Sequence, residues 1–291
     1  MIPAAFDYHR PATLDEAVEM VAQLGEDAKL LAGGHSLLPM MRLRLARPAA
    51  LVDLGGLRGE LSYVRDSGAV IAVGAMTRHH DVAVSEVLAR RLPLLARAAS
   101  TVGDPQVRHR GTLGGSLVHA DPAADLPAVA LALDAVMVAR GPQGEREIAA
   151  ADFFRGFFES DLRPDEVLRE VRFPIPRDGH GSAYLKFNRR AQDWATVGVA
   201  ALVELDGDRI ARVAVGLANM GATPLRARAV EAAITGATVG DADALHSAAE
   251  HADEDTSPAS DLAASADYRR HLARVLTRRA LEQAIQATAT G

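Results

Sequence analysis

The chain has 291 residues, no cysteine and a formal net charge of −6 at pH 7. Apolar residues make up 48% of it and charged residues 24%, the balance of a globular protein long enough for two or three subdomains. The acidic balance excludes a general nucleic-acid binder, because that role needs a basic surface. Without thiols the chain forms no disulfide, has no thiol nucleophile and cannot ligate an iron–sulfur cluster through cysteine.

The sequence pattern favours neither membrane insertion nor metal binding. No basic segment followed by an apolar run opens the chain, and nowhere do eighteen apolar residues occur together. Five histidines lack the spacing of a metal constellation: His35, His79, His80, His109 and His119. We therefore expect a cytoplasmic protein without a membrane span and without a metal site of its own.

The first 57 residues predict a βαβ-like unit. A short strand at 6–9 precedes a capping box of the Ser/Thr-x-x-Glu form, Thr13–Glu16, which begins a helix. Residues 28–31 and 51–54 predict two further short strands, and a glycine pair then breaks the pattern. We expect a first subdomain over residues 1–57.

Residues 58–176 predict a second subdomain. It contains an irregular stretch, 102–127, which is rich in glycine, proline and polar residues and lies between apolar segments. Long ordered loops of this kind usually carry function. The other expected elements are hairpin strands at 61–64 and 69–73, helices at 77–83, 92–99 and 126–133, and a strand at 135–139.

Prolines and glycines between Pro174 and Gly181 mark the next boundary. Beyond it, residues 177–291 predict a C-terminal domain with a three-stranded antiparallel sheet and amphipathic helices. The expected strands are 183–187, 196–205 and 210–217, and the expected helices are 230–234, 244–252 and 266–285. The fold class is therefore α+β.

Two glycine pairs about eighty residues apart, each followed by a serine, are the most informative motif. They lie in Ala32-Gly33-Gly34-His35-Ser36-Leu37 and in Thr112-Leu113-Gly114-Gly115-Ser116. Glycine lets the backbone approach a ligand and take φ > 0, so that successive N–H groups form a concavity suited to phosphate oxygens. Structural turns use the same residues, so one such loop alone is weak evidence. Two of them, each leading into an apolar stretch, favour convergence on a diphosphate.

Two aspartates follow the second glycine pair, Asp121 and Asp125, and flank a proline. Their carboxylates would be repelled by a phosphate, but they can accept hydrogen bonds from ribose or ribityl hydroxyls. The alternative for Asp125 is to cap the helix that starts at Leu126. The two roles are compatible, and the sequence leaves both open.

In these motifs the chain resembles the medium subunits of molybdenum hydroxylases, the family of the carbon monoxide dehydrogenase flavoprotein and of the FAD domain of xanthine dehydrogenase. Residues 32–39 are similar to the first flavin loop of that family and residues 107–125 to the second. The similarity runs from Phe6 to the C-terminal helices. It implies a two-subdomain FAD-binding fold of the PCMH type, followed by the C-terminal domain.

The resemblance also implies which residues meet FAD. The two glycine segments would hold the diphosphate, Lys29 would lie near the adenine, and Lys186 would approach the isoalloxazine from the C-terminal domain. Asp121 and Asp125 would contact cofactor hydroxyls. The implied set is Lys29, Ala32, Gly33, Gly34, His35, Ser36, Leu37, Thr112, Gly114, Gly115, Ser116, Asp121, Asp125, Lys186 and Trp194.

Trp194 stands where the family often has a tyrosine. An indole can stack on a flavin ring, but it has no phenolic hydroxyl. Packing in the core is the alternative for this residue, which is the only tryptophan of the chain.

The function implied by the resemblance is that of an FAD-carrying electron-transfer subunit in a heterohexameric complex. A large subunit would hold molybdopterin and a small subunit two [2Fe–2S] clusters, with electrons passing through FAD to a quinone, O2, NAD or another acceptor. The missing cysteines agree with this division. One alternative is a self-sufficient FAD-dependent oxidase, for which the ~110 residues after Pro176 are few. Another is a nucleotide-binding scaffold without redox use.

Overall fold

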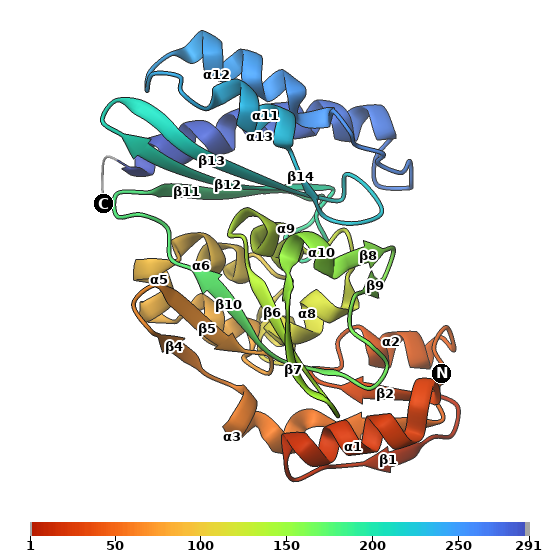
Figure 1. Cartoon of the computed structure of the whole chain (residues 1–291). Helices are drawn as coiled ribbons and strands as arrows, with labels where there is room; N and C mark the ends of the chain where they lie inside the picture. The colour runs from red at the N-terminus through yellow and green to blue at the C-terminus, as the bar shows by residue number, and fades with distance from the viewer. Residues whose placement is uncertain (1, 289–291) are drawn as a thin grey trace.

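The computed structural model describes residues 2–288 and shows three layers of the chain, one above another (Figure 1). The N-terminal part holds a parallel sheet in the order β1-β3-β2 and helix α1, whose apolar face packs on it. Thr13 caps α1 as predicted, with its Oγ1 accepting the N–H of Glu16 at 3.2 Å. The elements are β1 (Asp7–His9), α1 (Leu14–Leu24), β2 (Ala28–Leu31), α2 (Leu37–Arg42), β3 (Ala50–Asp53) and α3 (Arg58–Leu61).

The middle part is built on an antiparallel sheet in the order β4-β5-β10-β6-β7. The strand expected at 61–64 is wrong, because Leu61 ends helix α3 and is buried there, so that the hairpin starts only at Val64. The central strand β10 has no counterpart among the expected elements, since charged residues such as Glu170 interrupt its apolar pattern. The strands are β4 (Val64–Asp66), β5 (Val70–Gly74), β6 (Val136–Gly141), β7 (Gly144–Ala149) and β10 (Val167–Pro174).

Short helices pack against this sheet, and two of them lie in the stretch expected to be irregular. Polar residues that resemble a loop are helix caps here: Asp104 accepts the N–H of Val107 at 2.9 Å, and Thr112 accepts that of Gly115 at 3.1 Å. The helices are α4 (His79–Ala83), α5 (Glu86–Arg91), α6 (Pro93–Ser100), α7 (Pro105–Arg108), α8 (Leu113–His119), α9 (Asp125–Ala132) and α10 (Ala150–Phe153). A small hairpin follows, β8 (Phe154–Gly156) and β9 (Glu159–Ser160).

The C-terminal part is an antiparallel sheet in the order β11-β12-β13-β14, with helices on the face away from the middle part (Figure 1). The three predicted strands are present, and the two-residue β14 extends the sheet. The elements are β11 (Gly181–Phe187), β12 (Val197–Asp206), β13 (Arg209–Ala218), β14 (Leu225–Arg226), α11 (Arg228–Ile234), α12 (Ala242–Ala249) and α13 (Ala266–Thr288). No helix of the described chain is both long and apolar enough to cross a membrane.

Helix α9 lies in the seam between the middle and C-terminal parts, and all of its residues are buried. Strand β13 approaches it so closely that a Cβ at Gly216 would lie 2.1 Å from the carbonyl oxygen of Ala128. Tyr184 of β11 belongs to the same apolar core as Leu126 of α9. The core therefore continues across the seam, and the boundaries at residues 57 and 176 stay a prediction.

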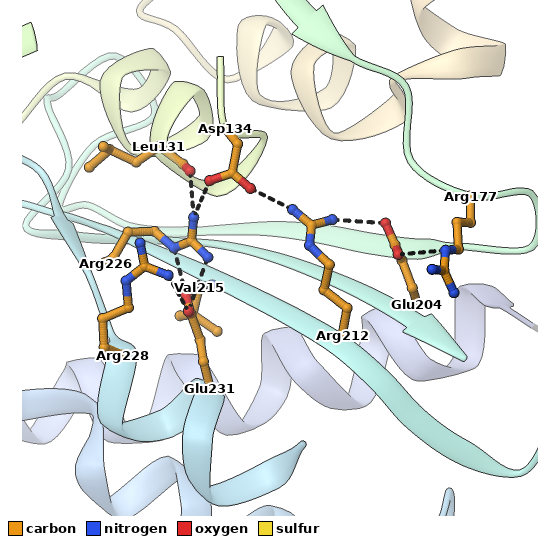
Figure 2. A network of polar contacts seen from close by, with 9 residues as sticks. All are labelled: Leu131, Asp134, Arg177, Glu204, Arg212, Val215, Arg226, Arg228 and Glu231. Atoms are coloured by element: carbon orange, nitrogen blue, oxygen red, sulfur yellow. Dashed lines mark hydrogen bonds and ion pairs between the residues drawn. The ribbon is translucent and has the colours of Figure 1, made fainter. Parts of the chain in front are cut away.

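Ion pairs connect the carboxyl end of α9 to the C-terminal sheet (Figure 2). Asp134 accepts from Arg226 at 2.7 Å and from Arg212 at 2.6 Å. Arg226 also donates to the carbonyl oxygen of Leu131 at 2.8 Å, and Arg212 to Glu204 at 2.8 Å. Arg226 also pairs with Glu231 of α11 at 2.6 Å, so each of these arginines has close acceptors on both sides of the seam.

Candidate functional site

The first glycine loop presents a row of backbone N–H groups without partners. None of the amides from Gly33 to Leu37 donates a hydrogen bond within the described chain. Gly34 has φ +78, a conformation that glycine adopts without strain and that turns neighbouring amides toward one side. The side chain of Ser36 makes no cap bond to α2. This loop therefore has the free donors that phosphate oxygens need.

The second glycine segment has its amides already bonded. Leu113 donates to the carbonyl of Thr77 and Gly114 to that of Ala75, both at 2.9 Å. Gly115 and Ser116 donate to Thr112, as the start of α8 requires. Positive φ is not the reason for glycine here. A Cβ at Gly114 would lie 2.6 Å from the Cβ of Ala75, so glycine allows α8 to pack against the end of β5.

The two glycine segments lie side by side. A Cβ at Gly33 would lie 2.3 Å from the carbonyl oxygen of Arg110 and 2.8 Å from the Cα of Gly111. A Cβ at Gly115 would lie 3.7 Å from that of Ala32. Both segments can therefore reach one ligand. Their joint binding of a diphosphate stays a prediction.

His79, at the start of α4, packs against the backbone just before the second segment. Its ring is so close to Gly111 that a Cβ there would lie 2.7 Å from Cδ2, and its buried Nδ1 has no partner in the described chain. Burial, together with the nearby His35 and Arg108, lowers the pKa of His79 to about 4. The ring is therefore neutral at pH 7.

A cleft of about 530 Å³ lies at the seam, lined by residues 100–108 and 184–192. Arg108 and Lys186 give it positive charge. Helix α7 spans only four residues and leads from this cleft to Arg110, which touches the first glycine loop. Since a helix rises about 1.5 Å per residue, only a short stretch of chain separates the cleft from the unpaired amides. That one ligand spans both stays a prediction.

Asp125, Tyr184 and Lys186 form a buried group beside this cleft. The Asp125 carboxylate accepts from the Tyr184 hydroxyl at 2.5 Å and from Lys186 Nζ at 3.0 Å. Burial raises the pKa of Asp125, and the Lys186 ammonium opposes that shift. Lys186 also donates to the carbonyl of Thr101 at 3.2 Å. The capping role considered for Asp125 is wrong: the cap residue is Ala124, and Asp125 is the first residue of the helix.

The remaining predicted residues lie at separate places around the site. Asp121 accepts the N–H of Ala123 at 2.9 Å, and burial raises the pKa of its carboxyl. Lys29 is exposed on β2. Trp194 is 70% exposed, so the alternative that it packs in the core is wrong. The contacts of all predicted residues with FAD stay predictions.

Sequence reasoning missed the residues that line the cleft opposite Lys186. Gly103 and Asp104 come from the stretch 102–127 expected to be irregular, and Thr101 directly precedes it. The turn signal Gly103-Asp104-Pro105 could have located them, because Asp before Pro begins a helix. No group of three or more His, Asp or Glu side chains between residues 2 and 288 is arranged to hold a metal ion.

Comparison with known protein families shows which family the chain belongs to. Residues 4–176 match the FAD binding domain in molybdopterin dehydrogenase, and residues 182–284 match the CO dehydrogenase flavoprotein C-terminal domain. The chain belongs to the FAD-binding medium subunits of molybdenum hydroxylases. This confirms the resemblance, the α+β fold with its FAD-binding and C-terminal parts, and FAD as the cofactor of this chain.

Individual relatives agree over nearly the whole length. The chain is 41% identical to the carbon monoxide dehydrogenase medium chain of Afipia carboxidovorans, over 98% of both. It is 38% identical to the 6-hydroxypseudooxynicotine dehydrogenase complex subunit alpha of Paenarthrobacter nicotinovorans, covering 98% of this chain and 96% of that one. A solved structure of carbon monoxide dehydrogenase from Hydrogenophaga pseudoflava matches with TM-score 0.95 and 44% identity over 98% of each chain. This medium subunit is thus a component of a molybdenum-dependent oxidoreductase.

Proposed function

We propose that this medium subunit receives electrons from the iron–sulfur clusters of a small partner subunit and passes them through FAD to an external acceptor. A large molybdopterin subunit would transform the substrate. The observation that supports this most is the row of unpaired amides from Gly33 to Leu37 beside Arg110, in a chain without cysteine. Bound FAD supplies the redox chemistry, and the protein supplies binding and electrostatics.

In this proposal, the first glycine loop and the cleft at Lys186 bind different parts of FAD. The unpaired amides of the first loop would bind the diphosphate. At the cleft, Lys186 uses two donors on Asp125 and Thr101, which leaves one N–H for a ligand. Because Asp125 and Tyr184 fix its position, this ammonium would place a positive charge beside the isoalloxazine.

Substrate choice belongs, in this proposal, to the large subunit. Relatives that cover 97–98% of this chain carry names with chemically different substrates, among them carbon monoxide, glyceraldehyde and caffeine. They share between 35% and 41% identity with it. A chain of nearly constant length beside such different substrates is best explained as their common electron carrier. A quinone, O2 and NAD are the candidate acceptors, and the cytoplasmic location rests on the sequence argument alone.

The test is to purify this chain alone and together with its two partners. Alone, it should be yellow, and organic substrates should leave its flavin oxidised. In the co-expressed complex, whose mass should fit a heterohexamer, substrate should bleach the flavin. If the isolated chain oxidises an organic substrate at an ordinary enzymatic rate, the self-sufficient oxidase replaces this proposal. A colourless chain would support the scaffold instead.

A further inference from the structure

A second cleft, of about 350 Å³, opens at the far end of β11 from Lys186. It lies where α5 and α6 of the FAD-binding part meet the linker, the start of β11 and the end of α13. Its lining includes four basic side chains: Arg90, Arg91, Arg97 and His180. No function described above uses it.

The arginines of this cleft lack the close carboxylates that arginines have elsewhere at the seam. The side chain of Arg90 makes no hydrogen bond or ion pair within the described chain, and the side chain of Arg97 donates one N–H to the carbonyl of Ser182 at 3.0 Å. The nearest carboxylates to Arg91 are at 3.7 and 4.0 Å, and the second belongs to the fully exposed Asp178. Around Asp134 the corresponding distances are 2.6 and 2.7 Å (Figure 2). Arg91 also donates to the carbonyl of Gly68 at 3.1 Å, whereas the guanidinium groups of Arg90 and Arg97 have no carboxylate partner in the described chain.

The buried hydroxyl of Ser182 is a second, independent indication that a ligand binds in this cleft. Ser182 is 2% exposed, and its Oγ has no hydrogen-bond partner in the described chain. In a strand, alternate side chains share a face, so Ser182 lies on the same face as Tyr184, which packs into the core of the FAD-binding part. The hydroxyl thus faces the seam at the cleft. Buried hydroxyls are normally paired, and this one is paired if an acceptor binds there.

We propose that this cleft binds a phosphate-class oxyanion, either free phosphate or the phosphate group of a nucleotide. Guanidinium groups bind phosphate through paired, charge-assisted hydrogen bonds, and Arg90 and Arg97 have free donors for them. The anion would join the two parts of the molecule. Two of the elements that would hold it continue to the cleft at Lys186, α6 toward Thr101 and β11 to Lys186 itself. Binding therefore steadies the element pair that positions Lys186.

The experiment uses FAD-saturated protein, so that phosphate cannot occupy the flavin site. Calorimetric titration with inorganic phosphate at constant ionic strength should show one saturable site, and thermal unfolding should shift upward. Arg97→Gln and Arg90→Gln should each weaken binding by at least about tenfold. Arg279→Gln removes an exposed arginine outside the cleft and should leave binding unchanged. Titration with AMP distinguishes the sources: tighter binding than phosphate indicates a nucleotide, and equal or weaker binding indicates the free ion.

Two results would overturn the proposal: no saturable phosphate binding to the wild type, or equal loss of affinity in Arg279→Gln and in the cleft variants. Circular dichroism and flavin absorbance per protein establish that each variant is folded. The side chain of Arg90 has no hydrogen bond or ion pair to lose, so Arg90→Gln tests the proposal even if Arg97→Gln destabilises the contact between the two parts.

Discussion

The two glycine segments have similar sequences and opposite hydrogen-bonding states. The amides from Gly33 to Leu37 are unpaired, whereas those from Leu113 to Ser116 are all bonded inside the chain. In the first, glycine exposes donors, with positive φ at Gly34; in the second, it allows α8 to pack against Ala75. A Gly-Gly-Ser pattern therefore identifies close backbone approach, and only the structure shows whether a ligand or the protein itself approaches.

The largest expected effect is on the packing side of this comparison. Gly114→Val places a branched side chain where even Cβ would lie 2.6 Å from Ala75, and overpacking of this kind costs about 3 kcal/mol. The free energy of unfolding, measured with urea, should fall by that amount, and FAD should be lost as a consequence. Gly59→Val is the control, because nothing lies within 4 Å of its Cβ. Unchanged stability of Gly114→Val would contradict the packing role.

The second effect is the acid sensitivity that His79 contributes beside the second segment. The pKa of His79 is lowered to about 4 in the folded state, so the unfolded chain binds more protons below about pH 6.5. The stability that its neutral ring provides is complete above that pH and is lost as the pH falls toward 4. Between pH 7 and pH 5 the loss should be about 2 kcal/mol. His79→Leu should remove this part of the pH dependence; a variant with the same acid sensitivity as wild type would refute it.

On the binding side, Gly33→Ala should separate cofactor affinity from stability. Its Cβ would lie 2.3 Å from the carbonyl oxygen of Arg110, so the first loop must move away from the second segment. We expect FAD to bind at least about tenfold more weakly, measured by flavin fluorescence titration. The apoprotein should lose less stability than in Gly114→Val, because Gly33 is only half-buried in a loop whereas Gly114 is buried. Wild-type affinity would show that the two segments need not touch.

Two matched hydroxyl variants sharpen the contrast further. Thr112 caps α8 with its Oγ1, so Thr112→Val should cost about 1 kcal/mol of stability. Ser36 makes no such bond, so Ser36→Ala should change stability by less than about 0.5 kcal/mol while weakening FAD binding. Equal stability losses in both variants would mean that Ser36 also caps its helix.

Local signals explain what could be predicted from the sequence. The capping box at Thr13 and the meander around β12 depend on neighbouring residues, so the pattern alone identifies them. The roles of Asp104 and Thr112 were harder to predict, since a cap and a loop residue have the same composition.

Most of the site depends on contacts between residues far apart in the sequence. Asp125 and Tyr184 are 59 residues apart, and Gly33 of the first glycine segment lies against Arg110 beside the second. No periodicity encodes such pairs. The family resemblance supplied Lys186 and Asp125 as candidates, but it did not indicate that they bond to each other.

The smallest effect on stability is expected at Trp194, which makes it a reporter for the comparison. Because its side chain is 70% exposed, Trp194→Ala should change the free energy of unfolding by less than about 0.5 kcal/mol. If the indole lies beside the flavin, its emission should be quenched in the holoprotein and recover when FAD is removed. As the only tryptophan, it reports without ambiguity. Gly33→Ala should then show unquenched emission from a folded chain, and Gly114→Val unquenched emission from a destabilised one. Equal emission from wild-type apoprotein and holoprotein would instead place Trp194 away from the cofactor.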